Sequence, residues 1–386
     1  MKTSLVSRRE FARVVGTAAA AAVAAPNLFG AAPAAAVQHE KRPANVGGTM
    51  VQIDSNENPY GPSPKALEAI TQSEKIASRY PDSVEAQIRD MIAEYHKVDP
   101  ENVVLGCGST EILRVADAAY LSPGKNVVTA EPTFEAVLRF AKVLHANTKT
   151  VPMTADYRFD LPAIAAACTA QTGLVYICNP NNPTGTIVSK SELATFVDKV
   201  SPSTIILVDE AYYHFADDPG YGTVMDWYGK HPNVIVARTF SKVYGMAGMR
   251  LGYAVGAKDT VALMRPHVLW SNANAAVCPA ACASLADTDN VARNRKMLNG
   301  TRKWLCDELK KDGRKYIPSQ ANFVMIDVGG DVQPLIPQFK NRGIWVGRKF
   351  PSMGNWLRVS IGTRPEMETF LAAFRGIVPA KGSSAA

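Results

Sequence analysis

Short apolar runs of strand length recur along the chain with helical segments between them, and this alternation limits the fold more than any other feature. The runs cover residues 102–105, 127–128, 174–178, 204–208 and 234–237. Helical patterns begin at Ser109, near Glu135, and over 191–200, with Ser189 or Ser191 as the N-cap. Strands that alternate with helices favour a mostly parallel sheet covered on both faces, so we predict an α/β fold. Ligands of such sheets bind at the carboxyl ends of the strands.

The pattern changes after about Pro279, to long helices plus two apolar runs at 323–326 and 356–359. A chain of 386 residues is long enough for two domains. We therefore predict a large domain at 81–278 with the mostly parallel sheet and a smaller α+β C-terminal domain at 279–379. Residues 37–80 are expected to form an N-terminal arm and part of the small domain, and residues 380–386 a flexible tail.

The first 36 residues have the pattern of an export signal. Arg8 and Arg9 precede the apolar run 14–25, and three alanines at 34–36 offer an A-x-A cleavage site before Val37. Paired arginines indicate the twin-arginine route, which leads to a periplasmic or otherwise exported, soluble mature chain. The alternatives are a membrane anchor or an alanine-rich soluble helix. The apolar run is too short to span hydrocarbon, so we expect no stable membrane anchor.

Charge and cysteine usage exclude two classes of function. The formal net charge is +7 and no basic block stands out, so we expect no nucleic-acid partner. The six cysteines are scattered and form no C-x-x-C pair, so neither a metal site nor a disulfide framework is expected.

Lys242 follows a strand-like apolar run and is the leading catalytic candidate. A lysine held next to apolar structure and a second cation can lose its proton near neutral pH, as an amine must to form a Schiff base. Arg250 lies eight residues later and can pair with a phosphate. A Schiff-base lysine beside a phosphate clamp indicates pyridoxal phosphate (PLP). The alternative for a lone Ser-Lys is a strand that ends in a solvated lysine.

A glycine turn after the 102–105 run is a candidate phosphate site. Gly106-Cys-Gly-Ser-Thr-Glu111 is a strand end, a turn and a helix start. The free N–H groups of Gly108, Ser109 and Thr110 can hold a phosphate, helped by the helix dipole. The alternative is a plain helix cap made by Ser109.

Three more polar residues follow apolar runs. Asn182 lies in the turn 179–185, whose two prolines and glycine make it rigid, and its amide can donate to a ring oxygen. Asp209 ends the run 204–208, where a carboxylate can keep a pyridinium nitrogen protonated or can cap the next helix. Tyr212 lies on the same face as Asp209 if residues 210–213 begin a helix, and its hydroxyl can reach the same ring oxygen as Asn182.

Together these residues resemble a known family. Asn182, Asp209, Tyr212, Lys242 and Arg250 have the order and approximate spacing of the class I and II, fold type I, PLP-dependent aminotransferases. The resemblance extends from about residue 54 to 377 and is closest to the histidinol-phosphate aminotransferase branch. The motifs that carry it are at 55–62 (SNENPYGP), 79–82 (RYPD), 179–185 (NPNNPTG) and 356–363 (WLRVSIGT).

The resemblance implies a role for each matching residue. Lys242 would form the Schiff base and then move a proton between substrate and cofactor, and Asp209 would pair with the pyridine nitrogen. Asn182 and Tyr212 would contact the ring hydroxyl. The phosphate would be bound by the remaining cofactor residues, which are Gly108, Ser109, Thr110, Thr239, Ser241, Arg250 and, from a neighbouring subunit, Tyr80. This last residue implies a homodimer with shared active sites.

The same resemblance implies how substrates bind. Arg358 would hold an anionic group, with Tyr60, Asn182 and Arg348 as further candidates. The expected partners are an amino acid or amine as donor and a 2-oxo acid as acceptor. Other PLP chemistry, such as decarboxylation or oxidation, and an exported non-catalytic binding protein are the alternatives.

Two positions depart from the branch. Phe134 stands at the ring-stacking position, where the branch commonly has tyrosine. Gly347 stands where the branch usually has an arginine, and Arg348 is the candidate to replace it.

Overall fold

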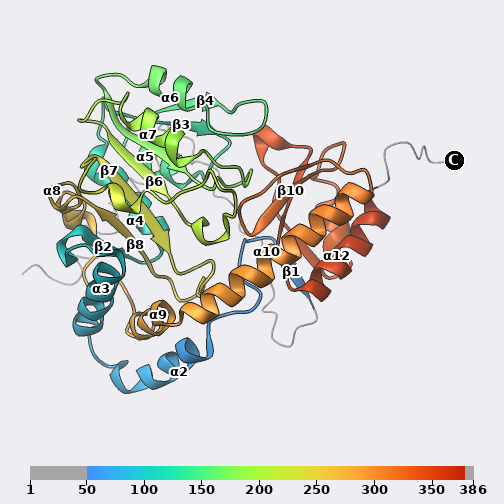
Figure 1. Cartoon of the computed structure of the whole chain (residues 1–386), viewed down its shortest axis with the longest axis horizontal. Coiled ribbons are helices and arrows are strands. Elements are labelled where there is room, and N and C mark those ends of the chain that lie inside the picture. Colours follow the sequence, from blue (N-terminus) through green and yellow to red (C-terminus); the bar gives the residue numbers. More distant parts are fainter. Residues whose placement is uncertain (1–49, 379–386) are drawn as a thin grey trace, which may run out of the picture. The chain divides into compact units, whose positions relative to one another are not determined.

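A seven-stranded sheet forms the core of the left-hand part of the structure in Figure 1. The computed structural model describes residues 50–378. In the strand order β2-β8-β7-β6-β5-β3-β4, only β8 runs antiparallel to its neighbours, so the predicted α/β fold with a mostly parallel sheet is confirmed. The strands are β2 (Val103–Gly106), β3 (Asn126–Glu131), β4 (Asn147–Pro152), β5 (Thr172–Cys178), β6 (Ile205–Asp209), β7 (Val234–Thr239) and β8 (Gly252–Gly256).

The five predicted apolar runs correspond to β2, β3, β5, β6 and β7, whereas β4 and β8 were not predicted. Five of the six side chains of β4 are exposed, because it is the edge strand, and it therefore lacks an apolar pattern. β8 is fully buried, but it is only five residues long and has glycine at both ends.

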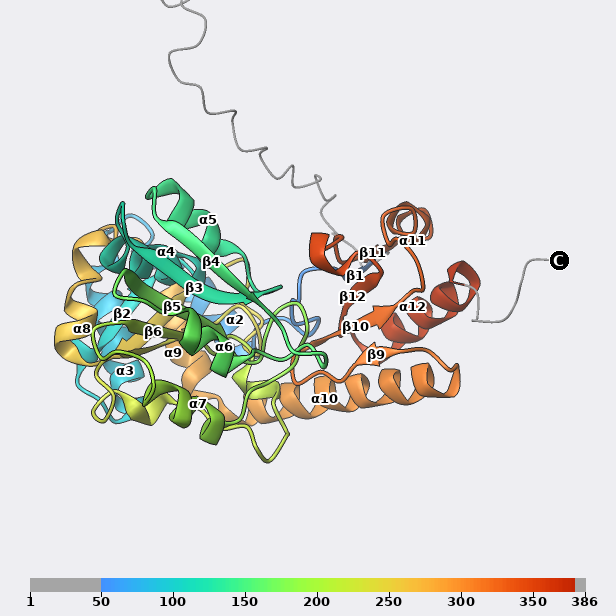
Figure 2. The ribbon, with the colours of Figure 1, turned by 90° about the horizontal axis from the view of Figure 1, so that it is seen from above.

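Helices cover both faces of the sheet, with α5 on one side and α7 on the other in Figure 2. Ser189 is the N-cap of α7. Its hydroxyl accepts a hydrogen bond from the amide of Glu192, and the carboxylate of Glu192 accepts one from the amide of Ser189. This capping box settles the choice between Ser189 and Ser191. The helices around the sheet are α2 (Pro64–Gln72), α3 (Asp82–His96), α4 (Ser109–Tyr120), α5 (Ala136–Val143), α6 (Leu161–Ala167), α7 (Lys190–Val197), α8 (Lys258–Ala262) and α9 (Val277–Ala286).

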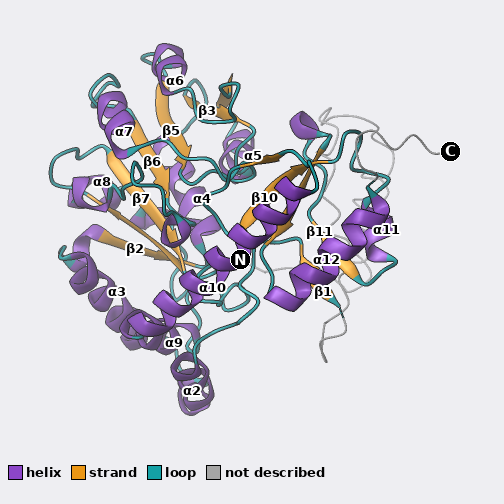
Figure 3. Cartoon of the chain, turned by 45° about the vertical axis from the view of Figure 1, so that its right-hand side comes forward, coloured by secondary structure: helices purple, strands orange, loops and turns teal. Residues whose placement is uncertain are grey.

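Two smaller sheets lie beside the long helix α10 (Thr288–Lys311) (Figure 3). β10 (Phe323–Asp327) pairs antiparallel with β9 (Tyr316–Ile317) and β12 (Trp356–Ser360), so both predicted C-terminal runs are strands. β1 (Val51–Ile53) pairs parallel with β11 (Ile344–Val346), which brings the start of the described chain to its C-terminal part. The remaining helices are α11 (Ile336–Lys340) and α12 (Arg364–Ile377).

Some predictions fall outside the described residues or are untested by them. The predicted signal peptide (1–36), the arm up to residue 49 and the tail (380–386) lie outside residues 50–378. The boundaries of the large and small domains stay predictions. Within the described range, no helix is long and apolar enough to cross a membrane, and no cluster of three or more His, Cys, Asp or Glu side chains is arranged to bind a metal ion.

Asp117 of α4 is a buried acid that makes the stability of the fold depend on pH. Neither carboxylate oxygen has a hydrogen-bond partner among the described residues. Burial raises the pKa of Asp117 to about 8, although the nearby backbone amide of Ala141 opposes this shift. The folded state therefore holds this proton more tightly than the unfolded state. Its contribution is fully favourable only below the unfolded pKa near 4, and it is lost as pH rises toward 8.

We expect Asp117→Asn to remove this pH dependence. The free energy of unfolding is measured by urea denaturation at each pH. The difference between the variant and the wild type should change in favour of the variant by about 2–4 kcal/mol from pH 5 to pH 8. The exposed Asp90→Asn should leave the wild-type pH profile unchanged. Parallel pH profiles for wild type and Asp117→Asn would contradict the prediction.

Candidate active site

Asp209 lies at the carboxyl end of β6, at the centre of the sheet. It is opposite Cys178 of β5 and only 3% of its surface is exposed. The hydroxyl of Tyr176 donates to Oδ2 at 2.9 Å, and the amide of Ala211 donates to Oδ1 at 3.1 Å. Burial raises the pKa of Asp209 to about 6, while these two donors and the charge of Lys242 oppose the rise. The carboxylate is therefore ionised at neutral pH and held in one orientation.

Lys242 lies in the loop that follows β7, and its amine points to the segment after β1. Nζ donates to the carbonyl oxygens of Asn56 at 3.2 Å and Ser55 at 3.5 Å, and it lies 5.4 Å from the centre of the Tyr212 ring. Burial, together with the positive charges of Arg358 and Arg250, lowers the pKa of Lys242 to about 8, while the carboxylates of Glu57 and Asp209 oppose the shift. A substantial fraction of the amine is therefore neutral and nucleophilic near neutral pH.

Thr239, the last residue of β7, forms one cluster with Ser241 and Arg250, which lie in the loop between β7 and β8. The hydroxyl of Thr239 donates to that of Ser241 at 2.9 Å and accepts from its amide at 3.0 Å. Nη1 of Arg250 lies 3.4 Å from the hydroxyl of Ser241. β8 lies between β7 and β2, and Gly252 pairs with Thr239 on one side and Gly106 on the other. This pairing brings the cluster to the N-terminus of α4.

Gly108 shows how closely Arg250 approaches the start of α4. A Cβ at this position would lie 2.1 Å from Nη2 of Arg250, and the φ of 78° is one that other residues rarely adopt. Gly108 is also the N-cap residue of α4, so the alternative in which Ser109 caps the helix is wrong. Ser109 and Thr110 occupy its first turn, where backbone amides and the helix dipole favour an anion. The guanidinium, two hydroxyls and the helix start thus lie close together, as a phosphate-binding site requires.

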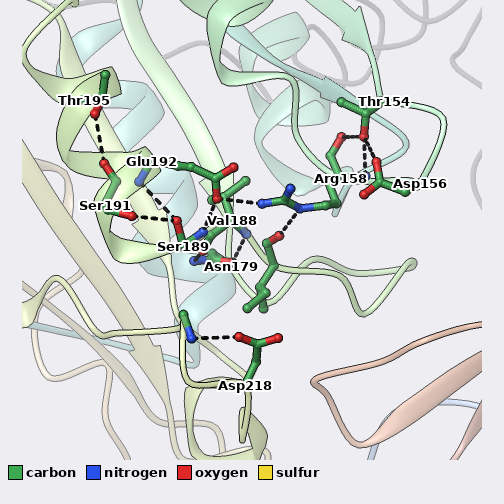
Figure 4. A network of polar contacts seen from close by, with 12 residues as sticks. Thr154, Asp156, Arg158, Asn179, Val188, Ser189, Ser191, Glu192, Thr195 and Asp218 are labelled. Atoms are coloured by element: carbon green, nitrogen blue, oxygen red, sulfur yellow. Dashed lines mark hydrogen bonds and ion pairs between the residues drawn. The ribbon is translucent and has the colours of Figure 1, made fainter.

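The turn that carries Asn182 is held rigidly by a polar network (Figure 4). The side chain of Asn179 donates to the carbonyl of Val188 at 3.0 Å and accepts from its amide at 3.1 Å, which closes the base of the turn. Arg158 ties the following residues to α7 by donating to the carbonyl of Ile187 and to Glu192. The position of Asn182 is therefore set by the fold.

Arg358 of β12 brings the C-terminal sheet to this turn. Nη1 donates to Oδ1 of Asn182 and Nη2 to the carbonyl of Asp54, both at 2.7 Å. Its Nε is buried and has no partner within the part of the chain that the structure describes. Its guanidinium carbon lies 5.7 Å from the ring centre of Phe323 and 5.2 Å from that of Phe350. A buried cation with unused donors fits an anionic group of a ligand.

Tyr212 faces the same centre, but from a different local structure than predicted. It precedes a short 3-10 helix, Tyr213–Phe215, so the expected helix over 210–213 is wrong. Its hydroxyl accepts from Nδ2 of Asn56 at 3.0 Å, and its ring meets Phe323 edge to face. The placement of Tyr212 thus comes from the contacts of its side chain with other segments.

Four further predicted residues differ in their exposure and in their partners. Tyr80 is 84% exposed and makes no contact with the cluster of its own chain. Arg348 donates to Glu135 at 2.8 Å and lies over Phe350, so its charge is already paired. Phe134 is partly buried in the loop after β3. Tyr60 is partly exposed, and its pKa is raised by burial and by the charge of Glu366.

Other residues, to which the sequence analysis assigned no individual role, contact the predicted residues. Asn56 contacts both Lys242 and Tyr212, and its backbone amide donates to the hydroxyl of Ser360. Its φ of 55° is left-handed, which asparagine tolerates better than most residues. The motif at 55–62 contained this signal. Tyr176 and Glu135, by contrast, show nothing in the sequence that distinguishes them from core and surface residues.

These residues fit PLP on their own chemistry. The site presents a hydroxyl and guanidinium cluster for a phosphate, an ionised buried carboxylate for a ring nitrogen, and a lysine whose pKa is lowered. The guanidinium of Arg250 lies against the bare backbone of Gly108, so an anion bound by that guanidinium is also close to the first turn of α4. This combination of groups matches what PLP requires.

Comparisons with known proteins agree. A family model described as aminotransferase class I and II matches residues 48–374. The histidinol-phosphate aminotransferase of Moorella thermoacetica is 36% identical over 332 residues, covering 85% of this chain and 86% of that protein. The aromatic amino acid aminotransferase of Cutibacterium acnes is 34% identical over 333 residues, covering 86% and 94%. The structure of histidinol-phosphate aminotransferase from Sinorhizobium meliloti with pyridoxal-5'-phosphate has a TM-score of 0.81 at 26% identity, covering 86% of this chain and 92% of that one.

Proposed function

The chain belongs to the class I and II aminotransferases and is a PLP-dependent aminotransferase, and on this premise we propose that its amino donor is an amino acid bound at the α-carboxylate by Arg358. The observation that carries this proposal is the buried guanidinium of Arg358. Its Nη atoms each donate one bond to the protein and keep a second N–H for a ligand. A planar carboxylate matches two such donors.

The surroundings of Arg358 favour a carboxylate over a phosphate. Gly347 cannot supply a second cation, since even a Cβ there would lie 2.6 Å from the carbonyl oxygen of Arg358. Arg348 is the next cation along the chain, but its side chain is 48% exposed and is held in an ion pair with Glu135, which also pairs with Arg139. A phosphate dianion would therefore face one buried guanidinium, that of Arg358, whereas a carboxylate is matched by a single guanidinium. This supports an amino acid donor over histidinol phosphate.

The side chains divide the reaction among them. PLP, when bound, supplies an electron sink that stabilises negative charge at the substrate Cα. Lys242, whose pKa is about 8, would remove the proton from the substrate Cα. Asp209 would pair with the ring nitrogen, and Asn182 and Tyr212 would hold the ring hydroxyl. Thr239, Ser241 and Arg250, with the first turn of α4, would hold the phosphate.

A donor scan tests the substrate proposal. Purified holoenzyme, with no 2-oxo acid present, is mixed with single amino acids or with histidinol phosphate while the visible band of the bound cofactor is followed. We expect one or more amino acids to remove the band with release of one equivalent of 2-oxo acid. A higher kcat/KM for histidinol phosphate than for every amino acid would overturn the donor assignment. Release of carbon dioxide, or uptake of oxygen, would instead indicate another PLP reaction.

We also propose a homodimer in which Tyr80 reaches the active site of a second copy. Tyr80 and Trp270 are 84% and 97% exposed and line the same hollow of about 730 Å³ on the surface, together with Leu269. Large aromatic side chains at such exposure are costly in water and are typical of interfaces.

We expect Trp270→Arg to shift the protein from dimer to monomer, because it puts a charge into an apolar contact. Sedimentation velocity measures the change, and PLP affinity should fall with it, since Tyr80 would no longer reach its neighbour. Val143→Arg, which charges another exposed apolar position, should stay dimeric. A wild-type protein that sediments as a monomer at micromolar concentration would contradict the proposal.

Export by the twin-arginine route remains our proposal for residues 1–36. It is supported by Arg8 and Arg9, the short apolar run and the alanine-rich end. When the full chain is expressed in a bacterium that has this pathway, the mature form should be found in the periplasm with Val37 as its first residue. Replacing both arginines with lysine should retain the chain in the cytoplasm. Equal distribution of the two forms would contradict the prediction.

A further inference from the structure

Tyr176 is a fully buried polar side chain to which the reaction described above assigns no role. It lies in β5, whose seven residues are all buried, and its side chain is 0% exposed. The strand is held on its other side by Thr129, whose hydroxyl donates to the carbonyl of Tyr176 at 2.7 Å. Phenylalanine would fill the same space without a polar atom to satisfy. The hydroxyl therefore needs an explanation of its own.

The hydroxyl of Tyr176 is directed at the carboxylate of Asp209. The distance from the hydroxyl to Oδ2 is 2.9 Å, and both side chains are buried. Tyr176 lies two residues before Cys178, which pairs with Asp209 on the neighbouring strand. The Tyr176 side chain therefore extends from β5 to the carboxyl end of β6. Burial and the charge of Asp209 raise the pKa of Tyr176 well above its usual value. The hydroxyl therefore keeps its proton and acts as the donor.

We propose that Tyr176 is a positioning residue that sets how strongly Asp209 holds the proton of the cofactor ring nitrogen. The proposal rests on the pairing of Asp209 with that nitrogen. Tyr176 occupies one lone pair of Oδ2 and the amide of Ala211 one of Oδ1. Each oxygen keeps capacity for one more bond. A carboxylate with two protein donors is a weaker base, so the shared proton stays on the ring nitrogen, where it draws electrons from the substrate.

Other groups also act on Asp209 and must stay constant in the test. The ammonium of Lys242 favours its ionised form and the neighbouring carboxylate of Glu210 disfavours it. The remaining titratable groups whose interactions include Asp209 are Cys178, Tyr212 and Tyr221. The Tyr176 hydroxyl can be removed without touching any of these charges, because Tyr176→Phe deletes one atom and preserves the ring.

The first measurement is the ¹⁵N chemical shift of the ring nitrogen in holoenzyme loaded with ¹⁵N-labelled PLP. In Tyr176→Phe we expect the signal to move toward the value of an unprotonated pyridine, because the more basic Asp209 takes a larger share of the proton. Tyr253→Phe is the matched control: it removes a hydroxyl that is equally buried and lies 2.9 Å from its partner, Nε2 of His96. This control should give the wild-type shift.

The second measurement needs no cofactor. With ¹³C-labelled aspartate in the apoprotein, the Asp209 carboxyl should titrate about one pH unit higher in Tyr176→Phe than in wild type. If Tyr176→Phe does not fold, 3-fluorotyrosine at position 176, which is a stronger donor, should lower the Asp209 titration and move the ¹⁵N signal the opposite way.

Unchanged ¹⁵N and ¹³C values in Tyr176→Phe or the fluorinated protein would overturn the proposal and leave Tyr176 as a packing residue. Asp209→Asn separates this failure from a failure of the underlying pairing. If Asp209→Asn changes the ¹⁵N shift but Tyr176→Phe does not, only the inference about Tyr176 is wrong. If neither substitution changes it, Asp209 does not pair with the ring nitrogen, and the proposal fails with that pairing.

Discussion

We expect Lys242→Ala to abolish transamination, with a loss of about 10⁴-fold or more in kcat. Lys242 is the amine at the centre of the site, and its pKa of about 8 suits it both to bond the cofactor and to move a proton at the substrate Cα. The methyl group of alanine can do neither. The measurement is the single-turnover rate at which a donor removes the visible band of the bound cofactor, with 2-oxo acid release as a second readout.

Two comparisons make the Lys242 result interpretable. Lys190→Ala removes a lysine from the surface of α7, where it pairs with Asp226, and should keep wild-type turnover. Cofactor retention in Lys242→Ala should persist through the phosphate cluster and Asp209, so the loss of rate is not a loss of PLP. If Lys242→Ala binds PLP and keeps more than about one hundredth of the rate, another base performs the proton transfer.

Asp209→Ala has the second-largest expected effect, a loss of about 10²–10⁴-fold in the rate of proton removal from Cα. Without the carboxylate, the ring nitrogen loses the partner that keeps its proton, and the electron sink weakens. The α-deuterated donor measures the step directly, since slower proton removal increases its kinetic isotope effect.

Asp209→Asn is the matched variant, because it keeps the shape of the side chain and removes its charge. It should resemble Asp209→Ala in rate but keep more of the wild-type stability, because an alanine would leave the hydroxyl of Tyr176 without an acceptor. Wild-type rates in both variants would mean that a different residue partners the nitrogen.

Most of the central sheet could be predicted from the sequence because its strands are buried on both faces. β5, β6 and β7 consist of continuous apolar residues, and such runs are visible without knowledge of their neighbours. β4 could not be predicted, since an exposed edge strand needs no apolar pattern. The helix considered for residues 210–213 does not form, for a related reason. Side-chain contacts between Tyr212, Asn56 and Phe323 determine the conformation of that segment, and local helix propensity does not.

For the active site, the sequence by itself determined which residues are candidates for the chemistry. Lys242, Asp209 and Asn182 lie at or after the carboxyl ends of parallel strands, and such ends meet at one edge of a sheet. Only the tertiary structure decided what surrounds them. Asn56 reaches Lys242 because β1 pairs with β11 at the far end of the chain, and Tyr176 of β5 reaches Asp209 on the neighbouring strand β6. Arg348 is held in an ion pair with Glu135, 213 positions away in the chain. Contacts of this kind depend on distances between segments far apart in sequence, and no local pattern of residues records those distances.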